Sequence, residues 1–252
     1  MSTPTALPDR IENEEHLEDL MSEPTPELVD DLKQVDGDIM VLGVGGKVGP
    51  TLARMAKRAA PGKRVIGVAR FSEPGLAEQL QSWGIETIRC DLLDPEAVAR
   101  LPKLRNIVYM AGKKFGTNDD PSFAWAMNTY VPALVAREFR ESRLVVFSTL
   151  CVYPFAPVVQ HGWDESVEPG PLGDYANSCV GRERAFAYGS RQWGTPGRLM
   201  RLNYSIDMRY GVLIDIANWV MQEQPIPIAT GHASVSWQGD CNAQTARSLR
   251  PR

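Results

Sequence analysis

The chain has 252 residues, which suits one large α/β domain or one domain with an appendage. Apolar residues make up 43% and charged residues 23%, an ordinary globular balance, and no apolar run is long enough to cross a membrane. The N-terminus lacks the apolar stretch of a secretory signal. Four cysteines without CxxC spacing argue against a zinc site or a disulfide framework, so we expect no metal and a reducing, cytoplasmic location: Cys90, Cys151, Cys179 and Cys241.

The first 36 residues are strongly acidic. They hold eleven acidic and two basic residues, a net charge of −9, while residues 37–252 carry a net charge of +5. A mildly basic body suits an anionic cofactor or substrate, although ordinary surface charge explains it equally well. Thr25-Pro26-Glu27 is a helix start with a capping residue, and Leu28 and Leu32 would form its apolar side. We expect residues 1–36 to be an acidic helical appendage that packs on the body or on a neighbouring subunit.

From Asp38 onward, short apolar strands alternate with amphipathic helices. This alternation predicts a parallel sheet covered by helices on both faces, the Rossmann-type doubly wound α/β class, over residues 37–210. The expected strands are 39–42, 64–68, 86–89, 106–110, 144–147 and 199–202, and the main expected helices are 48–60, 76–83, 123–140 and 175–193.

A glycine-rich turn joins the first strand to the first long helix. Gly43, Gly46 and Gly49 lie three residues apart, as required for a sharp exit from the strand, close approach of a pyrophosphate and tight helix–strand packing. The free N–H groups at the helix start would face the phosphates. Because the triplet lies in a strand–turn–helix context, it predicts a nicotinamide dinucleotide site formed by Gly43, Gly45, Gly46, Lys47, Val48 and Gly49.

The residues after the second and third strands bear on the choice of cofactor. Arg70 and Ser72 favour NADP over NAD, because an arginine accommodates a 2′-phosphate where NAD-binding chains usually carry an acid. A solvated arginine at a strand end is the alternative reading, so NAD stays open. Asp91 and Leu92 are placed to meet the adenine, although Asp91 could equally be a turn residue.

Four further features accompany the glycine turn: Val108-Tyr109-Met110-Ala111-Gly112, Asn128, Phe147-Ser148-Thr149-Leu150-Cys151-Val152-Tyr153-Pro154, and Pro171-Leu172-Gly173-Asp174-Tyr175-Ala176-Asn177-Ser178. Together they resemble the extended short-chain dehydrogenase/reductase family, the NAD(P)-dependent epimerases and dehydratases, from about Asp38 to Leu249. The resemblance implies that Thr149 and Tyr175 are the catalytic residues. It also implies cofactor contacts from Ala111, Gly112, Asn128, Tyr175, Cys179 and Asn203, and substrate contacts from Lys113, Ser148, Thr149, Tyr204 and Arg209.

The chain departs from the family where the catalytic tyrosine needs a cation. In the family a lysine four residues after the tyrosine, on the same helix face, pulls its pKa of about 10 toward neutrality. Here that position is Cys179, a small residue beside the cofactor. Arg182 lies two helical turns from Tyr175 on roughly the same face and would partly substitute, as would the charge of the nicotinamide. Otherwise Tyr175 works with a less depressed pKa, or the usual reaction is lost.

The resemblance implies an NAD(P)-dependent oxidoreductase acting on a secondary alcohol or ketone of a sugar or sugar-acid type substrate. The alternative is a non-catalytic NAD(P)-binding regulatory or structural protein that lost the lysine. Residues 211–252 would form a partial, abbreviated substrate lobe. The expected partner is a small-molecule substrate, with no nucleic acid and no membrane, and a homodimer stays open.

Overall fold

The computed structural model describes residues 8–157, 159, 162–228 and 231–251. A sheet of six parallel strands in the order β3-β2-β1-β4-β5-β6 forms its centre. This strand order confirms the Rossmann-type expectation. The chain adds strands toward one edge of the sheet from β1 to β3 and toward the other edge from β4 to β6. Open α/β sheets bind ligands at such a switch point, beyond the carboxyl ends of the strands. The strands are β1 (Ile39–Leu42), β2 (Val65–Ala69), β3 (Glu86–Arg89), β4 (Asn106–Tyr109), β5 (Arg143–Thr149) and β6 (Gly197–Leu202).

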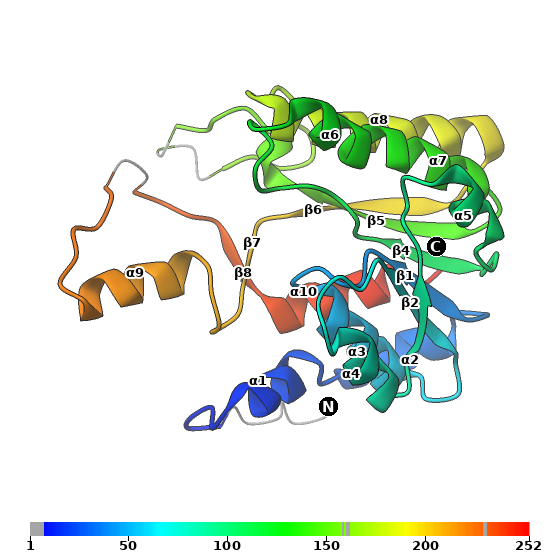
Figure 1. Ribbon diagram of the computed structural model, residues 1–252, viewed down its shortest axis with the longest axis horizontal. Helices are drawn as coiled ribbons and strands as arrows, with labels where there is room; N and C mark the ends of the chain where they lie inside the picture. The colour runs from blue at the N-terminus through cyan, green and yellow to red at the C-terminus, as the bar shows by residue number, and fades with distance from the viewer. Residues whose placement is uncertain (1–7, 158, 160–161, 229–230, 252) are drawn as a thin grey trace.

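Helices cover both faces of the sheet (Figure 1). One face carries α1 (Glu14–Met21), α2 (Pro26–Lys33), α3 (Gly49–Ala59), α4 (Leu76–Ser82) and α10 (Gln238–Arg247). The other carries α5 (Pro95–Arg100), α6 (Pro121–Trp125), α7 (Val131–Glu138) and α8 (Asp174–Trp193).

The helix expected over residues 123–140 is not continuous. A π-helical turn, Ala126–Tyr130, separates α6 from α7, and a short 3-10 turn, Leu150–Val152, follows β5. Pro132 stands at the start of α7 and has no N–H to donate to the carbonyl four residues before it, so the regular ladder cannot pass through this point. The widened turn contains the fully buried Asn128.

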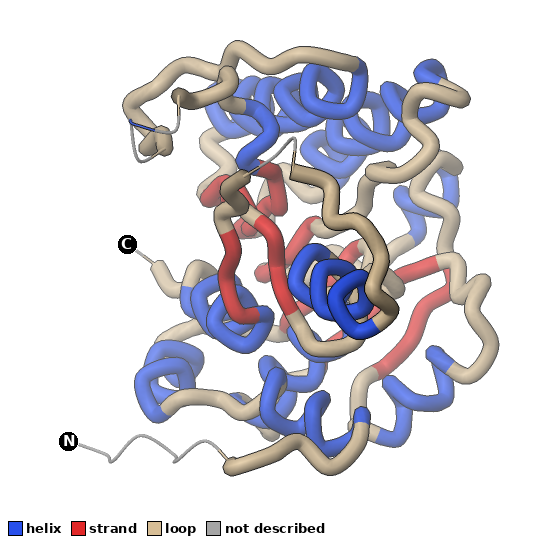
Figure 2. The backbone as a smooth tube through the Cα atoms, turned by 90° about the vertical axis from the view of Figure 1, so that its left-hand side faces the viewer, coloured by secondary structure: helices blue, strands red, loops and turns tan. Residues whose placement is uncertain are grey.

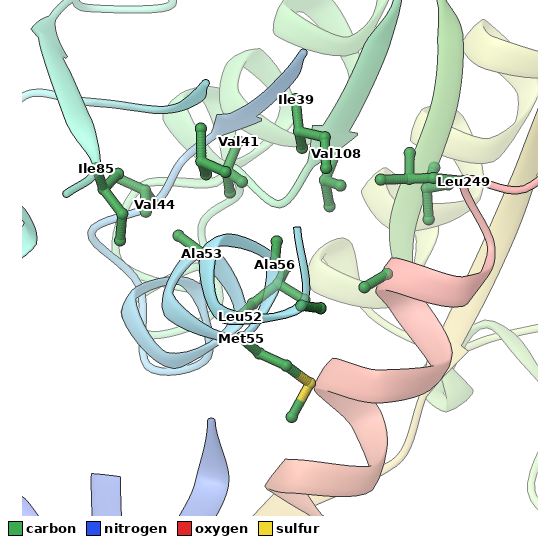
Figure 3. Packing of buried hydrophobic residues seen from close by; sticks show 14 of the residues in the cluster. Ile39, Val41, Val44, Leu52, Ala53, Met55, Ala56, Ile85, Val108 and Leu249 are labelled. Carbon is green, nitrogen blue, oxygen red and sulfur yellow. The ribbon is translucent and has the colours of Figure 1, made fainter. Parts of the chain in front are cut away.

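The hydrophobic core has two layers, because successive side chains of a strand point to opposite faces. Ile39 and Val41 of β1 belong to the cluster under α3, whereas Met40 and Leu42 belong to the cluster under α7. Figure 3 shows the first cluster, in which α3 side chains lie below β1 and β4 and Leu249 closes one end. The acidic N-terminal helix α2 and the last helix α10 share this core through Leu28, Leu32, Ala243, Ala246 and Leu249.

A second, two-stranded parallel sheet lies beside the carboxyl end of β6. It pairs β7 (Tyr204–Ile206) with β8 (Val235–Trp237). Between them comes α9 (Val212–Met221), which has no buried residue. Figure 2 views the molecule from the side that carries these elements. In the ranges that the structure describes, no helix is both long enough and apolar enough to span a membrane.

Candidate active site

A cavity of about 370 Å³ opens at the carboxyl ends of β1, β2, β3 and β4. This is the crevice in which Rossmann-type sheets bind dinucleotides. Nine of the residues expected to contact the cofactor line it: Gly43, Gly45, Gly46, Arg70, Ser72, Asp91, Leu92, Ala111 and Gly112.

The three spaced glycines have different physical roles. Gly43 has φ +89°, and a Cβ there would lie 2.6 Å from the Ala111 nitrogen. A Cβ on Gly49 would lie 2.2 Å from the Val44 carbonyl oxygen. These two positions therefore need glycine for the fold itself. Gly46 differs, because the nearest atom to an added Cβ is the Gly43 carbonyl oxygen at 3.8 Å, so the fold leaves room there.

The other expected turn residues lie outside the cavity lining. The Lys47 ammonium donates to the carbonyl oxygens of Ser205, at 3.1 Å, and Tyr210, at 3.0 Å. Val48 is buried in the core below the sheet, and Gly49 is packed against Val44. The turn therefore lines the cavity at Gly43, Gly45 and Gly46 and directs its only charged side chain, Lys47, elsewhere.

A second cavity, of about 570 Å³, lies next to the first along the loop after β4. Gly112 lines the first cavity and Lys114 lines the second. The expected catalytic residues Thr149 and Tyr175 both line the second cavity, as do Cys151, Tyr153, Asn203, Tyr204 and His232. The arrangement places a phenol and a hydroxyl beside a space large enough for a small-molecule substrate.

Tyr175 is held in its protonated form. Burial raises its pKa far above the ordinary value, and the neighbouring Cys179 raises it further. The nearby Thr149 hydroxyl and the charge of Arg182 act in the opposite direction without reversing the shift. Cys179 is itself fully buried, and burial raises the pKa of its thiol. The position at which the resemblance leads us to expect a lysine is thus filled by an uncharged, desolvated group.

Arg182 places a buried cation behind the loop after β4. Its guanidinium donates to the Phe147 carbonyl oxygen at 2.9 Å and to Asn128 Oδ1 at 2.8 Å. A Cβ on Gly112 would lie 2.3 Å from Arg182 Nη2, so this glycine is needed for the close approach. Over the described ranges no carboxylate pairs with Arg182, and its buried Nε finds no hydrogen-bond partner there. The guanidinium is a buried positive charge beside the glycine-lined crevice, without a carboxylate partner in the described ranges.

Asn128 connects the loop after β4 to helix α8. Its side-chain oxygen accepts from the Lys113 backbone N–H at 2.8 Å, and its Nδ2 donates to the Lys113 carbonyl at 2.8 Å and to Ser178 Oγ at 3.0 Å. Lys113 is therefore held by its backbone, while its ammonium lies over the Phe123 ring. Asn128 fixes the wall of the crevice and does not line the cavity itself.

A second group of polar residues fixes the end of β5. Ser148 Oγ donates to Glu183 Oε1 at 2.6 Å, and Arg201 donates to both Glu183 oxygens, at 3.0 and 2.8 Å. Arg201 also donates to the Tyr153 hydroxyl at 2.7 Å. The hydrogen bonds to the Glu183 carboxylate raise the pKa of Arg201. Ser148, expected to contact substrate, is turned into this buried network.

The remaining expected substrate residues divide between the cavity and its surroundings. Asn203 lines the second cavity and donates to Ser234 Oγ at 3.2 Å, and Tyr204 lines it with half of its surface exposed. Arg209 lies outside both cavities and pairs with Asp207 at 2.7 Å and Glu18 at 3.6 Å. Within the described part of the chain no group of His, Cys, Asp and Glu side chains could hold a metal ion.

Sequence reasoning missed Glu183 and Arg201, because a charge on a helix or at a strand end is usually solvated. The charged run Arg182-Glu183-Arg184 within an otherwise amphipathic helix is the signal that could have found Glu183. Arg182 was found by its spacing from Tyr175.

Comparison with known proteins agrees with this geometry. Residues 39–204 match the model of the NAD dependent epimerase/dehydratase family. Among solved structures, UDP-glucose 4-epimerase from Thermus thermophilus with NAD is 21% identical, with a TM-score of 0.69 over 84% of this chain and 74% of that one. DesIV, a dTDP-glucose 4,6-dehydratase from Streptomyces venezuelae solved as a double mutant, is 19% identical, with a TM-score of 0.71 over 84% and 72% of the two chains.

UDP-glucuronic acid 4-epimerase from Bacillus cereus is 17% identical, with a TM-score of 0.68 over 81% of this chain and 70% of that one. Among curated proteins none matches the sequence. At these identities the solved structures support the fold alone.

Proposed function

Because the chain belongs to the NAD-dependent epimerase/dehydratase family, we propose that it is a nicotinamide-dependent oxidoreductase that acts on a secondary alcohol or ketone of a sugar or sugar-acid type substrate. The observation that carries this proposal is the pairing of Tyr175 with Thr149 in a cavity that adjoins the glycine-lined crevice. A hydroxyl pair at the edge of a dinucleotide site is what proton transfer to or from a reacting oxygen requires.

The crevice fits a dinucleotide. The fold itself does not require glycine at position 46, because an added Cβ there would meet no atom closer than 3.8 Å. A glycine at this position supports the close approach of a pyrophosphate to the turn. Arg70 and Ser72 line the far end and would meet a 2′-phosphate, which favours NADP. Glu73 also lines that end, and its carboxylate would favour the free 2′-hydroxyl of NAD. We assign the preference to NADP because Arg70 follows β2 directly.

The proton chemistry follows from the state of Tyr175. A nicotinamide bound in the crevice would supply or accept the hydride at the substrate carbon. Tyr175, protonated at neutral pH, would donate its proton to the oxygen that becomes an alcohol, while Thr149 would hold that oxygen by a hydrogen bond. The reverse direction needs the phenolate, which the buried surroundings disfavour. Arg182 is the cation that we propose partly replaces the family lysine, because its charge lowers the pKa of Tyr175.

Two measurements test this function. Fluorescence titration with NADPH and NADH should show binding well below millimolar concentration for one or both. Incubation with NADP⁺ or NAD⁺ and a panel of nucleotide sugars, followed at 340 nm and by product analysis, should show turnover that Tyr175→Phe abolishes. Turnover unchanged by Tyr175→Phe would remove this residue from the mechanism.

A second candidate is a dinucleotide-binding protein without turnover. The buried thiol of Cys179 in the lysine position is the observation that favours it. Tight NADPH binding with no turnover on any substrate tested, together with unaltered binding in Tyr175→Phe, would support this alternative.

A further inference from the structure

The glycine turn is held from outside the crevice by its lysine. Lys47 follows Gly46 directly, yet its ammonium contacts three oxygen atoms of β7 and the segment after it: the carbonyls of Ser205 and Tyr210 and, at 3.4 Å, the carboxylate of Asp207. It also lies 4.1 Å from the centre of the Tyr210 ring. This lysine therefore ties residues 205–210 to the turn and is already satisfied without any phosphate.

Asp207 is the centre of this contact. Its side chain is fully buried, and it accepts hydrogen bonds from Arg209 Nη2 at 2.7 Å, Arg209 Nε at 2.9 Å and the Arg209 backbone N–H at 3.1 Å. Burial acts to raise the pKa of Asp207, but the bonds from Arg209 and the charge of Lys47 outweigh it, and the pKa is lowered. The group is a buried carboxylate held ionised between two cations.

Helix α1, the first of the two acidic N-terminal helices, adds a further charge next to Arg209. Glu18 of α1 lies 3.6 Å from Arg209 and accepts a hydrogen bond from Gln79 of α4 at 3.1 Å. The next residue, Asp19, pairs with Arg54 of α3 at 2.6 Å. Helix α1 lies against α3 and α10 (Figure 1), so Glu18 is anchored to the body and its reach to Arg209 is fixed.

We propose that α1 is a brace for the dinucleotide site, acting through the chain of contacts Glu18–Arg209–Asp207–Lys47 to hold the glycine turn in its binding geometry. The proposal rests on the proposed binding of a nicotinamide dinucleotide at this turn. Glu18 and Arg209 are positioning residues, since neither lines the cavity. The acidic appendage is thereby part of the cofactor site.

The physical reason is preorganisation. A turn containing four glycines in seven residues has an unusually large conformational entropy to lose when it orders around a ligand. Fixing Lys47 from the outer side removes part of that loss before binding occurs. Releasing the brace should mainly speed dissociation of the bound cofactor, because affinity differences between closely related complexes arise mostly in the dissociation rate.

The test compares Glu18→Gln with Glu15→Gln, a matched control at an exposed position of the same helix. Glutamine keeps the size of Glu18 and its contact with Gln79 but weakens its hold on Arg209. Stopped-flow displacement of bound NADPH should be about fivefold faster in Glu18→Gln, equivalent to about 1 kcal/mol, and unchanged in Glu15→Gln. Arg209→Lys, which keeps the charge but loses the planar fork, should give an intermediate rate.

Hydrogen exchange of the cofactor-free protein gives an independent readout. Glu18→Gln should speed exchange in peptides covering 43–49 and 205–211 and leave the strands unchanged, with the thermal midpoint close to that of the wild type. Unchanged exchange in both peptides overturns the brace. If the wild type binds neither NADPH nor NADH, the proposed function fails, and the exchange result alone decides whether α1 holds the turn.

Discussion

The titration of Tyr175 is the property in which this chain should differ most from an enzyme with the lysine in place. An ordinary tyrosine, with a pKa of about 10, is roughly 0.3% ionised at pH 7.5. Burial and Cys179 raise the pKa of Tyr175 above that value, so its ionised fraction at pH 7.5 is smaller still. A tyrosine tuned to a pKa of about 7 would be mostly ionised at the same pH.

The assay needs no substrate. Phenolate absorbance near 295 nm is recorded against pH for the wild type and for Tyr175→Phe, and the difference isolates this one side chain from the other six tyrosines. We expect no difference up to a pH of about 10 and a single-tyrosine step only above it. Repeating the titration with bound NADP⁺ measures how far the charge of the nicotinamide replaces the missing lysine.

A difference step with a midpoint of about 7 to 8 in the cofactor-free protein would refute the reasoning. It would mean that Arg182, or another cation, acts on Tyr175 far more strongly than desolvation does. Titration of Arg182→Met would show which cation is responsible. If the midpoint of the step moves to higher pH in this variant, the Arg182 guanidinium sets the pKa of Tyr175.

Three further predictions concern single side chains. Tyr109→Phe removes a fully buried hydroxyl with no partner among the described residues, so the free energy of unfolding by urea should stay equal or rise by about 1 kcal/mol, and a loss above 2 kcal/mol would contradict this. Gly112→Ala should displace Arg182 and weaken cofactor binding about tenfold, and unchanged affinity would show that the guanidinium has another place to go. Arg70→Ala should weaken NADPH more than NADH, and Glu73→Gln should weaken NADH more; equal effects would end the assignment of NADP.

The regular parts of this molecule are predictable from the sequence because they depend on local pattern. The apolar runs of β1, β4 and β5 identify buried parallel strands, and the glycine spacing after β1 identifies the turn. Every strand of the main sheet was expected within a few residues of its position. Burial on both faces leaves β1, β4 and β5 few alternatives.

The contacts of the site could not be predicted, because they depend on where distant segments meet. Lys47 is next to Gly46 in sequence but is drawn outward by Asp207, which lies 160 residues later in the chain. Ser148 is adjacent to Thr149 but points to Glu183 on the other side of the strand. The alternation of a strand predicts that neighbouring side chains point to opposite faces of the sheet. It does not predict which of the two lines the cavity.

Binding of a nicotinamide dinucleotide at Gly46 is the measurement that tests the central claim most directly. Isothermal titration with NADPH and NADH compares the wild type with Gly46→Ala, whose added methyl group meets no atom closer than 3.8 Å, and with Gly62→Ala, where nothing lies within 4 Å, as the control. We predict that the wild type and Gly62→Ala bind alike, and that Gly46→Ala binds about tenfold more weakly with an unchanged thermal midpoint. Equal affinity in all three proteins, or no binding by the wild type below millimolar concentration, would contradict the account.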